Sequence, residues 1–534
     1  MASSTNLRST NLRSRRSVAQ LHALAGVERE IRSHDSQNRR KYLREFNEAF
    51  GSYESVLDSV AIQSAVAEAD VVLVGDYHAL PTAQRSAASL LEQRALAGGR
   101  PVVLGLETIF ARDQHIVDEW WRREIDENEF RQRMRFDLDW GYDWRPFYEL
   151  LLAARDHAES IYGLDCMPRE DLRKIGARDR HAAAKLREIH ERHPNAVIFV
   201  LFGESHLAPS HLPKILREEL PETKILTVLQ NIDALYWRAA GERSDKIEGV
   251  RVTDDVICVF NATPLEKYES YRLFLDQWSR CENAPDFAPT IYNLIDSLAK
   301  FLEINRYSPH NGTQPKFLID LLPEVYGESS NTMLRRLLSR KGISEQDSES
   351  MLRQVEERGS AYWARLNAFC IREFQMMQIA EDVARFLHHA CQGLPHRLNG
   401  HNSGLPAHQL RPIDEFYANV VGHAVGYFGS RVLYPARPAL EDEAPQLSRA
   451  ALEKAAECAI RSETDKAASV AQEFGYAIGS QIYDAYLAGK VPSGGLRRLF
   501  LARLQEPGGA RKVCAALIAR LRSFSRSASR ATHA

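Results

Sequence analysis

Short aliphatic runs alternate with longer amphipathic segments from residue 70 to about residue 262. The runs consist mainly of Val, Ile and Leu without regular exchange of apolar and polar positions, which is typical of strands covered on both faces. They lie at residues 70–76, 101–107, 159–166, 196–204, 224–231 and 255–261. Strands that alternate with helices favour right-handed crossovers and a parallel sheet. The pattern therefore predicts an α/β domain with a parallel-sheet βαβ core.

After about residue 266 the apolar positions recur at helical spacing, which predicts a mostly α-helical C-terminal region without further strands. The predicted parts are a disordered basic N-terminal arm with a lead-in helix (1–44), the α/β domain (45–265), a helical region (266–390), a His/Gly/Pro loop (391–412), a second helical region (413–520) and an Arg/Ser tail (521–534). Solvated ends are expected because both termini are rich in Arg and Ser and lack apolar runs.

Two segments of the helical region share the pattern Gly-x-Ala-x-Gly, at residues 422–426 and 475–479. Glycines four residues apart lie on one helix face and let two backbones approach closely. Close packing of two helices is the expected role. A membrane-interacting pair is the alternative, although Glu473 and Asp484 and the short apolar lengths argue against it.

Composition adds constraints on partners and location. The 534 residues are 44% hydrophobic and 26% charged, with a formal net charge of −2. This near-neutral balance predicts no nucleic-acid or anionic-membrane partner. The seven cysteines form no CxxC pair, which argues against a disulfide framework and a structural zinc site. No secretory signal, lipobox cysteine or membrane-spanning run is seen, so a cytoplasmic location is expected.

Acidic residues and histidines follow several of the predicted strands. Residues 75–78 and 203–206 both read Gly-acid-x-His, and Glu107 and Asp165 end the second and third predicted strands. Ligands of open parallel sheets bind outside the carboxyl ends of the strands. These side chains are therefore expected to meet at one edge of the sheet.

Three kinds of chemistry fit such a set. His78, Glu107 and His206 could hold a divalent metal ion and act as a hydrolytic site, with Asp76 and Glu204 as further ligands. Without a metal, one histidine with a carboxylate partner could activate water as a general base. A wider pocket at the same edge could hold a larger cofactor. A capping role for each acid, with no ligand at all, is the simplest alternative.

Four segments carry a family resemblance, which covers about residues 55–262. The segments GDYH, GLETIFARDQHIVDEWW, FDLDWGYDWRPFYELL and FGESHLAPSHLP resemble the ChaN-like haem-binding uptake proteins of the Tiki and erythromycin esterase superfamily. The resemblance implies an α/β fold with the shared site at His78, Glu107 and His206. It implies haem binding in which a tyrosine ligates the iron, and Tyr77 and Tyr142 are the candidates.

The same resemblance implies a small-molecule ligand and a homodimer, because haem in ChaN-like proteins lies between protomers. It also leaves open a metal- or His-dependent hydrolase of the esterase or protease type, as in the other members of the superfamily. Haem binding is the favoured prediction and predicts a flat apolar wall beside the histidines, from Trp140, Tyr142, Trp144 and Phe147. Hydrolysis predicts a tight polar pocket with a divalent metal ion. If the domain is a scaffold without a ligand, replacing His78 or His206 should change neither binding nor turnover.

Overall fold

The computed structural model describes residues 2–34, 41–166, 175–242, 247–280, 285–305, 321–327, 331–392, 411–438, 440, 445, 447–460, 464–502, 504 and 506–531. The chain forms two compact units. Unit 1 contains residues 1–13 and 28–275, and unit 2 contains residues 14–27 and 276–534. Most of the predicted loop at 391–412 lies outside the described residues.

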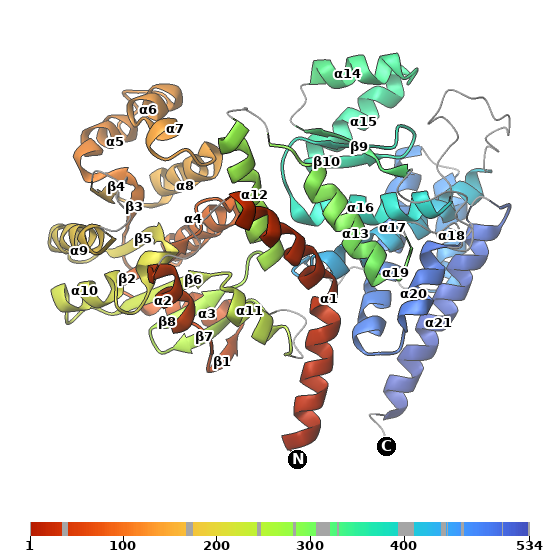
Figure 1. Ribbon diagram of the computed structural model, residues 1–534, viewed down its shortest axis with the longest axis horizontal. Helices are drawn as coiled ribbons and strands as arrows, with labels where there is room; N and C mark the ends of the chain where they lie inside the picture. Colours follow the sequence, from red (N-terminus) through yellow and green to blue (C-terminus); the bar gives the residue numbers. More distant parts are fainter. Residues whose placement is uncertain are drawn as a thin grey trace. The chain divides into compact units, whose positions relative to one another are not determined.

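Unit 1 is built on an eight-stranded sheet with the order β1-β7-β8-β6-β2-β5-β3-β4 (Figure 1). The strands are β1 (Ser55–Leu57), β2 (Val71–Asp76), β3 (Val102–Phe110), β4 (Ser160–Asp165), β5 (Val197–Gly203), β6 (Ile225–Gln230), β7 (Gly249–Thr253) and β8 (Val256–Val259). Neighbours from β8 to β4 pair in parallel, whereas β7 pairs antiparallel with both β1 and β8. The predicted parallel-sheet core is confirmed.

Helices cover both faces of this sheet, which explains the unbroken aliphatic runs. They are α2 (Lys41–Ala49), α3 (Ser59–Glu68), α4 (Pro81–Leu96), α5 (Gln114–Trp121), α6 (Glu127–Arg133), α7 (Phe136–Asp139), α8 (Trp144–His157), α9 (Ile175–Arg192), α10 (Leu212–Glu219), α11 (Asp233–Ala239) and α12 (Pro264–Arg280). Along β2, Val72 and Val74 enter one hydrophobic core, and Val71 and Leu73 enter the other.

Helix α1 (Ala2–His34) occupies most of the segment predicted as a disordered arm and lead-in helix. Its Leu, Arg and Ala residues have high intrinsic helix propensity. Its C-terminal half also buries apolar side chains, including Val27 and Ile31. The helix in this segment is therefore longer than the sequence analysis predicted.

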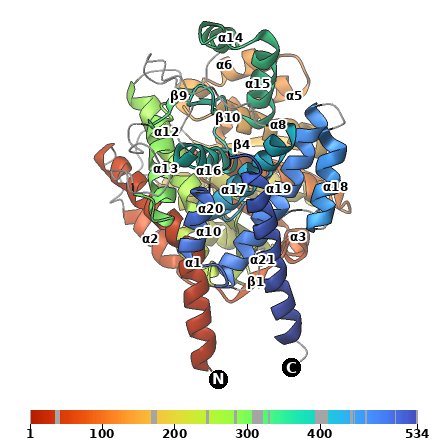
Figure 2. The same cartoon turned by 90° about the vertical axis from the view of Figure 1, so that its right-hand side faces the viewer.

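Unit 2 is mostly helical, as predicted. Its helices are α13 (Ala288–Phe301), α14 (Asn331–Arg340), α15 (Glu345–Arg358), α16 (Met376–Gln392), α17 (Pro412–Leu433), α18 (Arg449–Ile460), α19 (Thr464–Leu487), α20 (Ser493–Phe500) and α21 (Gly509–Ala531). Figure 2 shows α16, α17 and α19 close together, and α17 packs along both of the others.

The expectation that strands stop after residue 266 is wrong. Unit 2 contains a three-stranded sheet of β9 (Glu324–Gly327), β10 (Ser360–Trp363) and β11 (Ala368–Ile371). The helical pattern breaks at Gly359, which ends α15 with φ of +75°, and the turn of the hairpin holds Asn367 at φ of +49°. Both β10 and β11 are buried throughout but only four residues long, and runs this short do not separate strand from buried helix.

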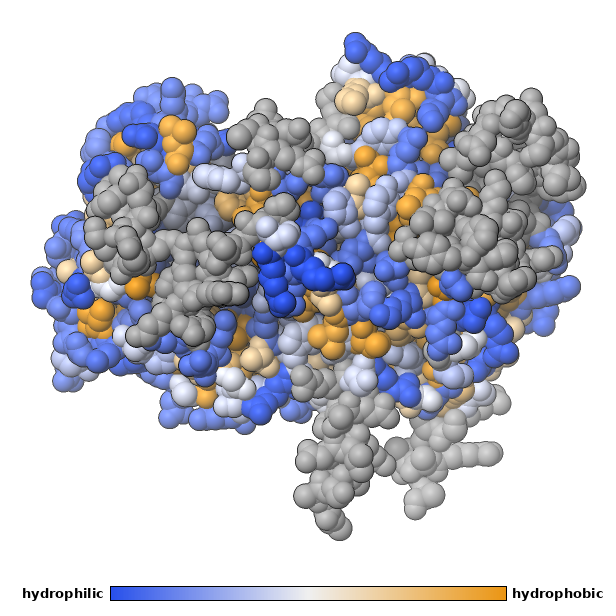
Figure 3. All heavy atoms as spheres, in the orientation of Figure 1, coloured by the Kyte–Doolittle hydropathy of each residue, from blue (hydrophilic) through white to orange (hydrophobic). Residues whose placement is uncertain are grey.

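The two Gly-x-Ala-x-Gly segments lie on α17 and α19. A Cβ atom at Gly475 would lie 2.7 Å from the carbonyl oxygen of Val420, and one at Gly479 would lie 2.6 Å from that of Ala424. Close helix packing is thus the role that the structure supports for the segment on α19. Among the described residues, no helix is long and apolar enough to cross a membrane. On the face drawn in Figure 3, hydrophobic side chains form small patches among hydrophilic ones.

Candidate functional site

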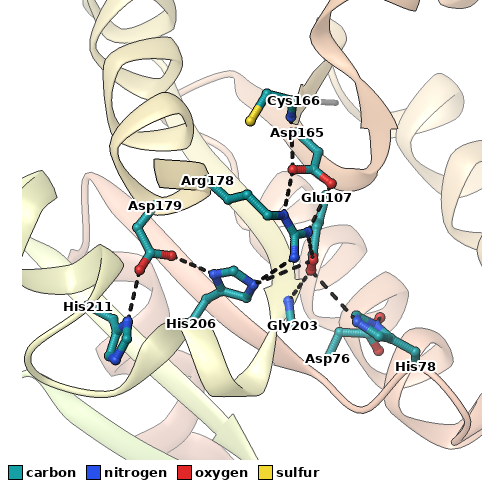
Figure 4. Close-up of polar contacts among 10 residues, drawn as sticks. All are labelled: Asp76, His78, Glu107, Asp165, Cys166, Arg178, Asp179, Gly203, His206 and His211. Carbon is teal, nitrogen blue, oxygen red and sulfur yellow. Dashed lines mark hydrogen bonds and ion pairs between the residues drawn. The ribbon is translucent and has the colours of Figure 1, made fainter. Parts of the chain in front are cut away.

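Strand order brings the two Gly-acid-x-His motifs together. Strand β5 lies between β2 and β3, although it follows both in the sequence. Asp76 at the end of β2 is in register with Gly203 at the end of β5, and Leu106, just before Glu107, is in register with Leu201. The residues after these strands therefore meet at the carboxyl edge of the sheet (Figure 4).

Glu107 lies between the two motif histidines. Its Oε2 is 3.9 Å from Nε2 of His78, and its Oε1 is 3.8 Å from Nε2 of His206. The backbone N–H of Gly203 donates a hydrogen bond to Oε2. A Cβ atom at Gly203 would lie 2.9 Å from that oxygen and 3.2 Å from the His78 ring. Glycine at this position lets the carboxylate and the imidazole approach the backbone of β5.

His78 is oriented by Asp76. Nδ1 of His78 is 2.7 Å from Oδ2 of Asp76, and Gln84 donates a hydrogen bond to the other oxygen of this carboxylate. Because a carboxylate only accepts, Nδ1 carries the proton of the neutral ring and Nε2 carries the lone pair. The side chain of His78 is 23% exposed, whereas that of Asp76 is 2% exposed.

Arg178, which the sequence analysis did not single out, is at the centre of the buried part of the site. Its Nη2 donates to Oε1 of Glu107 at 2.5 Å and to Oδ2 of Asp165 at 2.9 Å, and its Nε donates to Oδ1 of Asp165 at 3.0 Å. Burial opposes the charged form, but Glu107 and Asp165 raise the pKa of Arg178 above its ordinary value. The guanidinium is therefore a fixed positive charge between two carboxylates.

His206 is held inside the protein by Arg178 and Asp179. Nη1 of Arg178 is 3.3 Å from Nε2 of His206, and Nδ1 of His206 contacts Oδ1 of Asp179 at 2.5 Å. Since a guanidinium only donates, Nε2 of His206 is the acceptor and Nδ1 carries the proton. The other oxygen of Asp179 contacts Nδ1 of His211 at 2.9 Å. The His206 side chain is 4% exposed.

The residues at this edge do not fit the predicted metal site. The guanidinium of Arg178 lies where an ion shared by Glu107 and His206 would lie, and it uses the lone pair of the His206 nitrogen that faces Glu107. A divalent cation would have to displace a buried positive charge. Across the described parts of the chain, no group of three or more His, Cys, Asp and Glu side chains could hold a metal ion.

Aromatic side chains surround the exposed part of His78. The His78 ring lies 4.4 Å from the Trp140 ring and 5.3 Å from the Tyr142 ring, measured between centroids. Tyr142 stacks on Phe274 of α12 with centroids 4.3 Å apart and an interplanar angle of 20°. We call Trp140, Tyr142 and Phe274 the aromatic wall. It contains two of the four predicted aromatic residues.

The other two predicted aromatic residues belong to the hydrophobic core. Trp144 and Phe147 are buried on α8 and contact Phe136. Phe147 also contacts Trp140, with ring centroids 5.7 Å apart. Phe147 thus supports Trp140 of the wall, and no ring contact joins Trp144 or Phe147 to His78 among the described residues.

Tyr77 and Glu204, the middle residues of the two motifs, lie around a buried lysine. Nζ of Lys267 donates to both carboxylate oxygens of Glu204, at 3.0 and 3.1 Å, and lies 4.5 Å from the centre of the Tyr77 ring. Burial alone would lower the pKa of Lys267, but Glu204 raises it. Glu204 is thus neutralised by Lys267, whereas Asp76, His78, Glu107 and His206 form the cluster described above.

A positional signal could have identified Arg178 and Asp179. A helix that follows a parallel strand begins near the carboxyl edge of the sheet, and α9, which follows β4, begins at Ile175. Charged residues in the first turn of such a helix are candidates for the site. Lys267 gives the same signal, because α12 follows the parallel strand β8 and begins at Pro264.

Part of unit 1 matches a known protein family. Residues 62–197 match the family model described as haem-binding uptake, Tiki superfamily, ChaN. These residues lie within unit 1 and include His78 and Glu107, whereas His206 lies beyond their end. Unit 1 therefore contains a segment that matches the ChaN family model, and the resemblance inferred from the motifs is confirmed for this segment.

Two solved structures align with this chain at low similarity. The type III effector HopBA1 aligns over 40% of this chain and 97% of its own, with 12% identity and a TM-score of 0.30. ChaN of Campylobacter jejuni, described with cofacial haem binding, aligns over 38% of this chain and 91% of its own, with 14% identity and a TM-score of 0.26. No curated protein matches this chain significantly.

Proposed function

We propose that unit 1 binds haem at the carboxyl edge of its sheet, with His78 as the iron ligand and the aromatic wall against the porphyrin. The observation that supports this most is the pairing of a partly exposed imidazole with Tyr142 stacked on Phe274. Flat apolar ligands stack well on such rings. The match to a haem-binding family model gives independent support.

His78 is a better iron ligand than the other candidates. Nε2 of His206 accepts a hydrogen bond from Arg178 inside the protein. Burial raises the pKa of Tyr77 well above its ordinary value, which opposes the phenolate form that would bind ferric iron. Tyr142 lies beside His78 and is assigned to the wall, where its ring contacts the ligand by stacking.

A haemin titration of the full chain, followed by Soret absorbance, tests the proposal. Saturable binding is expected for the unmodified protein and for Tyr77→Phe, and its loss is expected for His78→Ala. His115→Ala is the control, because His115 is exposed on α5 and makes none of these contacts. Binding that is equal in His78→Ala and the control would refute His78 as the ligand.

The second candidate is hydrolysis without a metal ion, and the pairing of Asp76 with His78 favours it. In this reaction, Nε2 of His78 would take a proton from water while Asp76 stabilises the imidazolium that forms. If the domain is an enzyme, it is a hydrolase of this kind. Hydrolysis of p-nitrophenyl esters that survives EDTA and is lost in His78→Ala would support this candidate, and no turnover would refute it for these substrates.

The remaining parts of the proposal concern assembly and location. A haem bound at an exposed edge would be shared by two copies of the chain, as the family resemblance implies. Sedimentation velocity of the haem-loaded protein should then show a dimer, and a monomer would contradict this. A cytoplasmic location is also proposed, and fractionation of the native source tests it.

A further inference from the structure

Unit 2 contains a second group of charged and polar side chains, where α16 crosses α17. A Cβ atom at Gly426 of α17 would lie 3.1 Å from Cγ of Glu381 and 3.2 Å from Cγ of Arg385. Glu381 and Arg385 are four residues apart and share one face of α16. The absence of a side chain at Gly426 therefore lets both long side chains pass across α17.

Glu381 is the anchor of this group. Its carboxylate accepts hydrogen bonds from Nη1 of Arg437 at 2.9 Å and from the hydroxyl of Tyr476 at 2.8 Å, and it lies 3.3 Å from Nη2 of Arg358. Burial opposes ionisation, but the guanidinium groups lower the pKa of Glu381. With its carboxylate bound in this way, Glu381 holds two arginines and a tyrosine in place.

Several buried polar atoms beside this anchor have no hydrogen-bond partner among the described residues. They are Oδ1 of Asp382, Nδ1 of His389 and Nδ1 of His423. The other oxygen of Asp382 accepts a hydrogen bond from Ser360 at 2.9 Å. An unsatisfied buried polar atom lowers the free energy of unfolding, so several in one place point to a function other than stability.

Arg385 completes the group. It is partly buried and makes no hydrogen bond or ion pair with any residue that the structure describes. It is close enough to His389 and His423 that its charge adds to burial in lowering the pKa of both histidines, each to about 3. The arginines Arg358, Arg385 and Arg437 therefore outnumber the carboxylates of Glu381 and Asp382, and the histidines are neutral.

We propose that this group is a ligand site for a small molecule with a carboxylate or phosphate group, bound by Arg385 and oriented by His423 and Asp382. A guanidinium presents a planar fork of N–H donors that matches the oxygens of either group. The buried atoms of Asp382 and His423 would hydrogen-bond polar groups elsewhere on the ligand. The proposal does not depend on haem binding by unit 1.

Calorimetric titration of the full chain with inorganic phosphate and, separately, with acetate tests this proposal at constant ionic strength. We expect saturable binding of at least one probe and a roughly tenfold or greater loss of affinity in Arg385→Met. Arg385→Lys should bind with intermediate affinity, because it keeps the charge but loses the fork. The control is Arg372→Met, which removes only an exposed ion pair with Glu356.

Two results would overturn the proposal. One is the absence of saturable binding of either probe, and the other is equal affinity in Arg385→Met and Arg372→Met. Because Arg385 makes no hydrogen bond or ion pair with a described residue, Arg385→Met is expected to fold, and thermal unfolding of Arg385→Met and Arg385→Lys checks this. The Soret response to haemin should be the same in all of these variants, which separates this site from the one in unit 1.

Discussion

The two Gly-acid-x-His motifs deliver the same residue types to one sheet edge, but their histidines occupy different surroundings. The His78 side chain is 23% exposed beside an aromatic wall, and its Nδ1 pairs with Asp76. The His206 side chain is 4% exposed and lies between Arg178 and Asp179. A repeated motif can therefore supply one partly exposed histidine and one that is enclosed by the protein.

The largest loss of stability is expected from removing the buried cation that contacts His206. Arg178→Met would leave Glu107 and Asp165 as buried carboxylates without their partner, at a cost of about 3–5 kcal/mol in the free energy of unfolding. Urea denaturation measures this. Arg187→Met on the same helix is the control and should cost at most about 1 kcal/mol, because Arg187 pairs with Glu219 at the surface. Equal losses of unfolding free energy in the two variants would show that Arg178 does not compensate buried carboxylates.

A smaller loss of stability is expected from filling the space that His78 shares with Glu107. Gly203→Ala would place a methyl group 2.9 Å from Oε2 of Glu107 and 3.2 Å from His78. We expect a loss of about 1–3 kcal/mol in unfolding free energy and weaker haemin binding. Gly51→Ala is the control. A Cβ atom at Gly51 would have no neighbour within 4 Å, so this variant should change neither the unfolding free energy nor haemin binding. Unchanged binding in Gly203→Ala would contradict the close approach of these groups.

The histidines of unit 2 extend the comparison to imidazoles that are buried without a carboxylate partner. Burial lowers the pKa of His423 to about 3, so the unfolded chain binds a proton below about pH 6.5 that the folded chain does not. Stability should therefore fall as the pH falls from 7 to 5, by about 2 kcal/mol for this group. His423→Asn should reduce that slope in urea denaturation, and His115→Asn should not. An identical slope in both variants would contradict the assigned burial.

The smallest effect is expected at the outer end of the His206 network. His211→Ala removes one hydrogen bond to Asp179, which keeps its contact with His206. A loss of about 1 kcal/mol in unfolding free energy and no change in haemin affinity are expected. Chemical denaturation and the Soret titration measure the two quantities. A loss of haemin binding would mean that the network around His206 reaches the ligand.

Sequence patterns predicted the elements that are buried on both faces, because aliphatic runs such as 70–76 and 196–204 are long and continuous. They did not predict β7, β10 or β11, since these four- or five-residue strands contain no comparable aliphatic run.

Only the site residues at or next to strand ends were predictable from the sequence. Glu107 lies near the end of β3, and His78 and His206 come shortly after β2 and β5, so parallel topology alone brings them together. The different roles of the two histidines depend on Arg178, which follows no strand directly and lies in the first turn of α9. Tertiary packing, rather than any local pattern, decides which imidazole is covered.

The most direct test of this difference is chemical rescue of haem binding by free imidazole. His78→Gly should lose the Soret shift with haemin and regain it when imidazole is added, because the small molecule can replace a ligand at an exposed edge. His206→Gln should keep the Soret shift without imidazole. Loss of the shift in His206→Gln, or its persistence in His78→Gly without imidazole, would contradict the assignment of His78 as the ligand and His206 as scaffold.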